Sequence, residues 1–76
     1  MEETTASNYI KDLGQLIKEK ALDAKTKSQV SSDTYDIGFL MAWHDIVSLM
    51  QTQAVAFGIS YEEIGLSGID PDVDLL

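Results

Sequence analysis

The stretch of residues 34–57, TYDIGFLMAWHDIVSLMQTQAVAF, decides the fold of this chain. Its apolar residues recur at steps of three, four and seven, the spacing that places side chains along one face of a helix. Together they cover an arc near half of the circumference, whereas the apolar stripe of an ordinary surface helix is a little over about 100° wide. We therefore predict a helix over 34–57 with more apolar surface than one antiparallel neighbour can cover.

Three apolar rows and one polar strip, which includes His44 and Gln51, make up this predicted helix. Large aromatic residues and methionine dominate the energy of desolvated interfaces. The rows that begin at Phe39 and at Trp43 are therefore candidates for burial against a partner. For Trp43, packing within the chain's own core is the favoured interpretation. The rows are Phe39, Ala42, Ile46 and Leu49, then Trp43, Met50 and Phe57, then Leu40, Val47 and Ala54.

Both ends of the 34–57 helix carry boundary signals. Ser32 or Asp33 can supply the side-chain oxygen of an N-cap, and Asp36 suits the positive end of the helix dipole. Gly58 followed by Ile59 is typical of a helix that ends at a left-handed glycine. These signals predict a helix with well-defined ends.

A second helical pattern precedes this one, and it predicts a helix over 8–27 after an N-terminal tail of residues 1–7. Residues 28–32, which are polar except for Val30, then form a connection short enough to make the two helices an antiparallel hairpin. Ser7 or Asn8 can cap the first helix. Its apolar stripe consists of Ile10, Leu13, Ile17, Ala21 and Ala24.

Gly38 is a glycine in a helix interior, where it costs about 1 kcal/mol relative to alanine. In the hairpin it falls level with Ala21. Either the two backbones cross closely there, or the glycine is simply tolerated, and the sequence leaves both alternatives open.

The chain after Gly58 is predicted to contain one helical turn and then an extended arm. Ser60 and Glu63 match a capping box, which predicts a turn over 60–65. Residues 66–76 alternate apolar and acidic side chains, a period of two that favours an extended strand-like arm. The arm either folds back over Phe57 or stays free for a partner.

Charge is divided unevenly along the chain, and this division limits the partners. The five basic residues are all lysines before residue 28, whereas residues 28–76 carry only acidic charges and the net charge is -8. A surface built on the second half repels phosphate backbones and anionic lipids and favours basic proteins or apolar grooves. We therefore expect neither nucleic acid nor a membrane as partner.

The small size of the chain makes self-association the expected source of extra stability. A chain of 76 residues buries only about 60% of the surface that its unfolded form exposes. It contains no cysteine and one histidine, which excludes disulfides and argues against a structural metal site. The first residues do not resemble an export leader and the longest apolar run, 37–43, is far short of the ~20 residues of a membrane span. We expect a cytoplasmic protein.

His44, Asp45 and Ser48 are the residue types of a hydrolytic triad, but their spacing argues against one. Asp45 is adjacent to His44 and so points about 100° away around the helix, where it cannot orient the imidazole. No glycine-rich turn offers an oxyanion hole. We therefore predict no catalytic residue and no enzyme activity.

Two further comparisons fail at decisive residues. Asp70, Asp72 and Asp74 match the first three ligand positions of a calcium loop, but Pro71 interrupts them and no later bidentate glutamate follows. Acyl carrier proteins are similarly short, helical and acidic, yet no serine here lies in their Asp-Ser-Leu attachment motif. We predict no metal and no cofactor.

The sequence therefore predicts an all-α protein, an antiparallel two-helix hairpin with a short C-terminal helical turn and an extended acidic arm. It is expected to form a homodimeric four-helix bundle. This plan is similar in architecture to the Rop-type bundle, without shared motifs, so RNA binding is not inferred from it. The predicted dimer or partner interface consists of Phe39, Trp43, Ile46, Leu49, Met50 and Phe57, and the possible acidic docking arm of Asp70, Asp72, Asp74, Leu75 and Leu76.

For function, the sequence favours a small interaction or regulatory module that binds another protein. The alternative is an acidic inhibitor, such as an immunity protein, an antitoxin or a nucleic-acid mimic, that blocks a basic site on a toxin or nucleic-acid-binding enzyme. Charge mimicry weakens steeply with ionic strength and apolar docking does not, so salt dependence separates the two.

Overall fold

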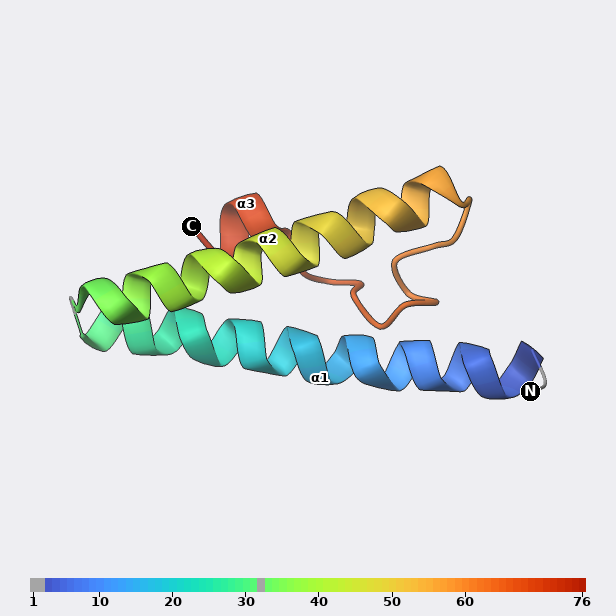
Figure 1. Cartoon of the computed structure of the whole chain (residues 1–76), viewed down its shortest axis with the longest axis horizontal. Helices are drawn as coiled ribbons and strands as arrows, with labels where there is room; N and C mark the ends of the chain where they lie inside the picture. Colours follow the sequence, from blue (N-terminus) through green and yellow to red (C-terminus); the bar gives the residue numbers. More distant parts are fainter. Residues whose placement is uncertain (1–2, 32) are drawn as a thin grey trace.

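The computed structural model describes residues 3–31 and 33–76, which form two long antiparallel helices and a segment that returns along them (Figure 1). Helix α1 spans Glu3–Val30, α2 spans Thr34–Ala56 and the short α3 spans Pro71–Asp74. The molecule is elongated, with principal extents of 44 × 20 × 17 Å. The predicted all-helical hairpin is confirmed.

Helix α1 is longer at both ends than the predicted 8–27. It begins at Glu3, so residues 3–7 are helical instead of forming a tail, while residues 1 and 2 lie outside the described part of the chain. With 28 residues against 23 in α2, α1 is the longer of the two helices.

The ends of α2 follow the predicted signals closely. The Oδ1 atom of Asp33 accepts a hydrogen bond from the Tyr35 backbone N–H at 3.0 Å, which makes Asp33 the N-cap; Ser32, the other candidate, lies outside the described residues. At the other end Gly58 adopts a φ of 69°. The Ile59 N–H donates to the Ala54 carbonyl oxygen at 2.8 Å, which completes the glycine stop.

The contact between α1 and α2 is built from small side chains on α1 and one of the three predicted rows on α2. Ala21 and Ala24 are fully buried on α1, and their size lets the helix axes approach closely. The row of Leu40, Val47 and Ala54 is buried, whereas the row containing Ile46 is not. Helix α2 is therefore rotated about its axis so that the row of Leu40, Val47 and Ala54 faces the core, and the row that contains Ile46 faces solvent.

The C-terminal segment, defined here as residues 66–76, is docked against the hairpin and is not the extended arm that the alternation predicts. Asp70 caps a helical turn through Oδ1, which accepts from the Asp72 N–H at 3.0 Å, and Pro71 occupies the first turn. The segment does not cover Phe57, which remains 75% exposed. The side chains that it buries are Leu66, Ile69, Pro71 and Leu75.

The C-terminal half crosses α1 at two glycines whose main chains touch. A Cβ atom on Gly14 would overlap the Ile64 carbonyl oxygen, and one on Gly65, whose φ is +74°, would overlap the Lys11 carbonyl oxygen. Gly38, in contrast, has no atom within 4 Å of the place its Cβ would take. The close crossing considered for Gly38 is thus absent there, and the tolerated glycine is the correct alternative.

Substituting alanine at Gly14 and Gly38 tests this crossing, because both exchanges gain the same helix propensity of about 1 kcal/mol. At Gly14 the methyl group must displace main chain, so we expect a net loss of about 2 kcal/mol or more in the free energy of unfolding. Gly38→Ala should instead stabilise the protein. Thermal unfolding measures both, and a Gly14→Ala protein as stable as Gly38→Ala would contradict the crossing.

Candidate functional site

Side chains from both long helices hold the C-terminal segment in place. Lys18 Nζ donates to the Ser67 carbonyl oxygen at 2.7 Å, and Lys25 Nζ donates to the Leu76 main-chain oxygen at 2.5 Å. These two lysines lie two helical turns apart on one side of α1. Two of the five lysines thus bind the chain's own C-terminal segment.

Gln51 is the buried polar centre of this attachment. Its side chain is only 6% exposed, and its Nε2 atom donates to the carbonyl oxygens of Leu66 at 3.2 Å and Ile69 at 2.9 Å. A buried carbonyl without a donor costs free energy, so one side chain that satisfies two of them stabilises the docked position. Gln51, which the sequence places in the polar strip of the helix, is thus buried beneath the C-terminal segment.

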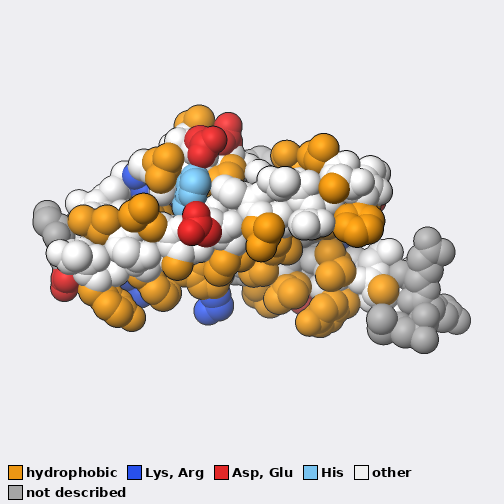
Figure 2. Space-filling model, turned by 45° about the horizontal axis from the view of Figure 1, so that its top comes forward, with side chains coloured by type: hydrophobic (Ala, Val, Ile, Leu, Met, Phe, Trp, Pro, Cys, Tyr) orange, Lys and Arg blue, Asp and Glu red, His pale blue; other side chains and the backbone are white. Residues whose placement is uncertain are grey.

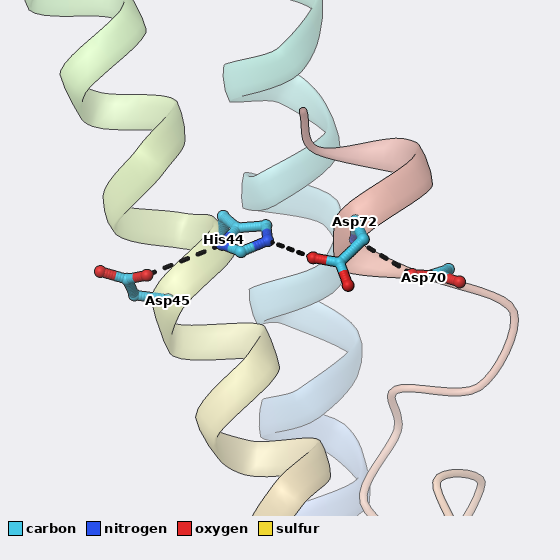
Figure 3. A network of polar contacts seen from close by, with 4 residues as sticks. All are labelled: His44, Asp45, Asp70 and Asp72. Carbon is cyan, nitrogen blue, oxygen red and sulfur yellow. Dashed lines mark hydrogen bonds and ion pairs between the residues drawn. The ribbon is translucent and has the colours of Figure 1, made fainter.

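His44 links α2 to α3 through a carboxylate that the sequence alone does not place beside it (Figure 3). Its Nε2 atom lies 2.9 Å from Asp72 Oδ1, and its Nδ1 atom lies 3.6 Å from Asp45 Oδ1. The hydrogen bond with Asp72 raises the pKa of His44, opposed by partial burial and assisted by Asp45. Figure 2 shows this histidine in pale blue between acidic side chains.

His44, Asp45 and Ser48 are not arranged as a hydrolytic triad. Both ring nitrogens of His44 are directed at carboxylates, so neither is placed to take a proton from Ser48. The expectation that Asp45 points away from the imidazole is wrong, because its Oδ1 atom lies 3.6 Å from Nδ1 of His44. Asp72 is exposed to solvent, unlike the buried carboxylate that orients a catalytic histidine. The geometry therefore offers no activated nucleophile at these residues.

The acidic residues of the predicted docking arm are used in different ways. Asp70 and Asp74 cap the α3 turn, since Asp74 Oδ2 accepts from the Asp70 N–H at 2.8 Å. Asp72 is bound to His44. Among residues 3–31 and 33–76, no cluster of histidine and carboxylate side chains is arranged to hold a metal ion. Of the two leucines, Leu75 is fully buried and so belongs to the core, whereas Leu76 is exposed.

A large apolar surface lies on the side of the hairpin away from the C-terminal segment. On α2, successive residues are about 100° apart around the axis. Ile46 and Gln51 therefore lie on opposite sides of the buried Val47. On α1, Leu16 is two residues from Gly14 and therefore lies on the side opposite to the crossing. Figure 2 shows hydrophobic side chains gathered along its lower edge, away from the acidic groups of α3.

We call this surface the open face. Of the predicted interface residues, only some belong to the open face. Phe39, Ile46, Leu49 and Phe57 are exposed on it, whereas Trp43 and Met50 pack at the edge of the core. Sequence reasoning did not include three of its exposed side chains, Tyr9, Leu16 and Tyr35. The open face consists of Tyr9, Leu16, Tyr35, Phe39, Ile46, Leu49 and Phe57.

Some of the residues that hold the C-terminal segment carried a signal in the sequence. Asp70-Pro71 is a typical helix start, with a capping carboxylate followed by proline in the first turn. Gly14 is a helix-interior glycine like Gly38, and nothing local separates the two. Gln51 could not be recognised, because its partners are main-chain carbonyls at least 15 residues away.

Comparison of the chain with protein-family models, with curated proteins and with solved structures finds no match. No helix in the described part of the chain is long and apolar enough to cross a membrane.

Gln51→Met tests the double hydrogen bond, because methionine has a similar shape and no donor. We expect a loss of about 1–3 kcal/mol in the free energy of unfolding, since the Leu66 and Ile69 carbonyls lose their donor. Gln53→Met, at an exposed position of the same helix, is the matched control and should change stability by less than about 0.5 kcal/mol. Equal denaturant midpoints for the two variants would rule out this role.

The His44–Asp72 contact predicts a pH dependence of stability with a definite sign. A raised pKa in the folded state means that the contact stabilises fully below the unfolded value of ~6.5 and that this stabilisation is lost as the pH rises through the folded pKa. Wild type should therefore exceed His44→Gln in melting temperature by more at pH 6 than at pH 9. If the difference is the same at both pH values, the contact does not contribute.

Proposed function

We propose that this chain is a small protein-interaction module without catalytic activity, and that its open face pairs with the open face of a second copy to form a four-helix bundle. The exposure of these seven large apolar side chains on one side of the hairpin carries the proposal. A second copy is the partner that supplies a matching surface without any further assumption.

The area of the open face is adequate for a stable dimer. The exposed fractions of its seven side chains, which range from 39% at Ile46 to 75% at Phe57, together equal about four fully exposed large residues. At roughly 200 Å² for each such side chain the face offers about 800 Å², the contribution of one partner to an interface of standard size. Exposed apolar patches of this size on small proteins mark interaction surfaces.

Charge placement supports this mode of pairing. The carboxylates of the C-terminal segment lie on the other side of the hairpin, so two copies can join their open faces without bringing these groups together. Asp70, Asp72 and Asp74 then stay on the outside of the bundle, where solvent and salt screen them.

A second candidate function is that of an acidic inhibitor of a basic site. The exposure of Asp45, Asp70 and Asp72 around His44 favours it. Binding of this kind weakens steeply as salt increases, whereas pairing of the open faces does not. Self-association that persists in high salt therefore favours the first proposal.

The mass of the protein in solution tests the proposed dimer. One charge substitution should dissociate the dimer, and a second should leave it intact. Wild type should have twice the mass of the chain, and Ile46→Asp should reduce it to one chain with its helical circular dichroism retained, because a buried unpaired carboxylate opposes pairing. Met41→Asp is the control: Met41 is also exposed on α2 but lies about 140° away from Ile46 around the helix. A single-chain wild type, or an Ile46→Asp protein of unchanged mass, would refute the dimer.

A further inference from the structure

A groove of about 600 Å³ lies between the first turns of α1 and residues 59–64, at the end of the hairpin where the two long helices diverge (Figure 1). This volume is within the range of ligand-binding sites in proteins, roughly 300–1,000 Å³. Its apolar floor is formed by Ile10, Ile59 and Ile64, of which Ile10 and Ile59 are each 37% exposed. None of these residues belongs to the open face.

A main-chain crossing and local hydrogen bonds fix the walls of the groove. The Gly14–Gly65 crossing fixes residues 59–64 against α1. Within that wall, the Ser60 hydroxyl accepts from the Glu63 N–H at 3.2 Å, and the Leu66 N–H donates to the Tyr61 carbonyl oxygen at 2.9 Å. A preformed groove loses little conformational entropy when it binds.

The rim of the groove is acidic on one side and offers donors on the other. Glu62 and Glu63 are adjacent and exposed, and the ion pairs of the described residues all involve His44. Asn8 and Lys11 line the opposite wall, where their amide and ammonium groups can donate to the carbonyl oxygens of a bound chain. An apolar floor between carboxylates and donors is complementary to a basic, apolar peptide.

We infer that this groove binds a short segment of another protein in which an aliphatic side chain is flanked by lysine or arginine. The aliphatic side chain covers Ile10 and Ile59, and the basic side chains pair with Glu62 and Glu63. This inference rests on the proposed role in protein binding but uses a different surface, so a dimer joined by its open faces carries two such grooves.

The test uses a fluorescein-labelled peptide of alternating lysine and leucine, titrated with the full chain and followed by fluorescence anisotropy. Because the chain is strongly acidic, a variant must separate the groove from the net charge. Glu62→Lys combined with Glu63→Lys should weaken binding by about tenfold or more, since it reverses the rim. The matched control, Glu19→Lys combined with Asp23→Lys, changes the net charge equally at exposed α1 positions outside the groove and should weaken binding by about twofold or less.

A peptide of alternating lysine and serine should bind about tenfold more weakly than the lysine–leucine peptide, because it leaves the apolar floor uncovered. In the wild type, amide NMR shifts on addition of the peptide should be confined to residues 6–11 and 59–64. Equal weakening by the two double variants, equal binding of the two peptides, or shifts centred elsewhere would overturn the inference. A dimer with no groove binding refutes this inference alone, whereas groove binding by a single-chain protein refutes the proposed dimer alone.

Discussion

The contact between the main chains at Gly14 and Gly65 is the constraint on which the rest of the structure depends. It brings the main chain of Ile64 and Gly65 against α1 at a distance that no side chain permits. Once the chain is held there, Leu66 and Leu75 supply the large buried side chains that the interface of α1, built on Ala21 and Ala24, lacks. The C-terminal segment is therefore a third layer of the core and not an appendage.

This third layer makes the molecule asymmetric, and the asymmetry decides which surfaces are available for binding. One side of the hairpin is covered by residues 66–76. The side chains of Lys18, Lys25 and Gln51 hold these residues in place by hydrogen bonds to their main-chain oxygens. The other side keeps its aromatic and aliphatic residues exposed. The proposed dimer follows from this division, since Asp70, Asp72 and Asp74 lie in the segment that covers the closed side and the seven apolar side chains lie on the open side.

His44 illustrates how the tertiary structure changes the meaning of a residue. In the sequence its neighbours are Asp45 and Ser48, which raises the question of catalysis. In the folded chain its ring is bound to Asp72, 28 residues later, and it joins two structural elements. A structural contact of this kind needs the same residue types as a catalytic one, and only the positions of the atoms distinguish the two.

The sequence by itself determined the two long helices, the N-cap of α2 and the glycine stop at Gly58, because these depend on residues within one or two turns of each other. It also determined the division of charge, which follows from the order of the residues alone. Only the tertiary structure decided which apolar row of α2 is buried, that Gln51 points inward, and that residues 66–76 dock against the hairpin. The rotation of a helix about its axis depends on contacts from distant parts of the chain, here between residues separated by as many as 51 positions. Within residues 66–76 the alternation favours an extended arm and Asp70-Pro71 favours a helix start, and the surface against which the segment packs decides between the two.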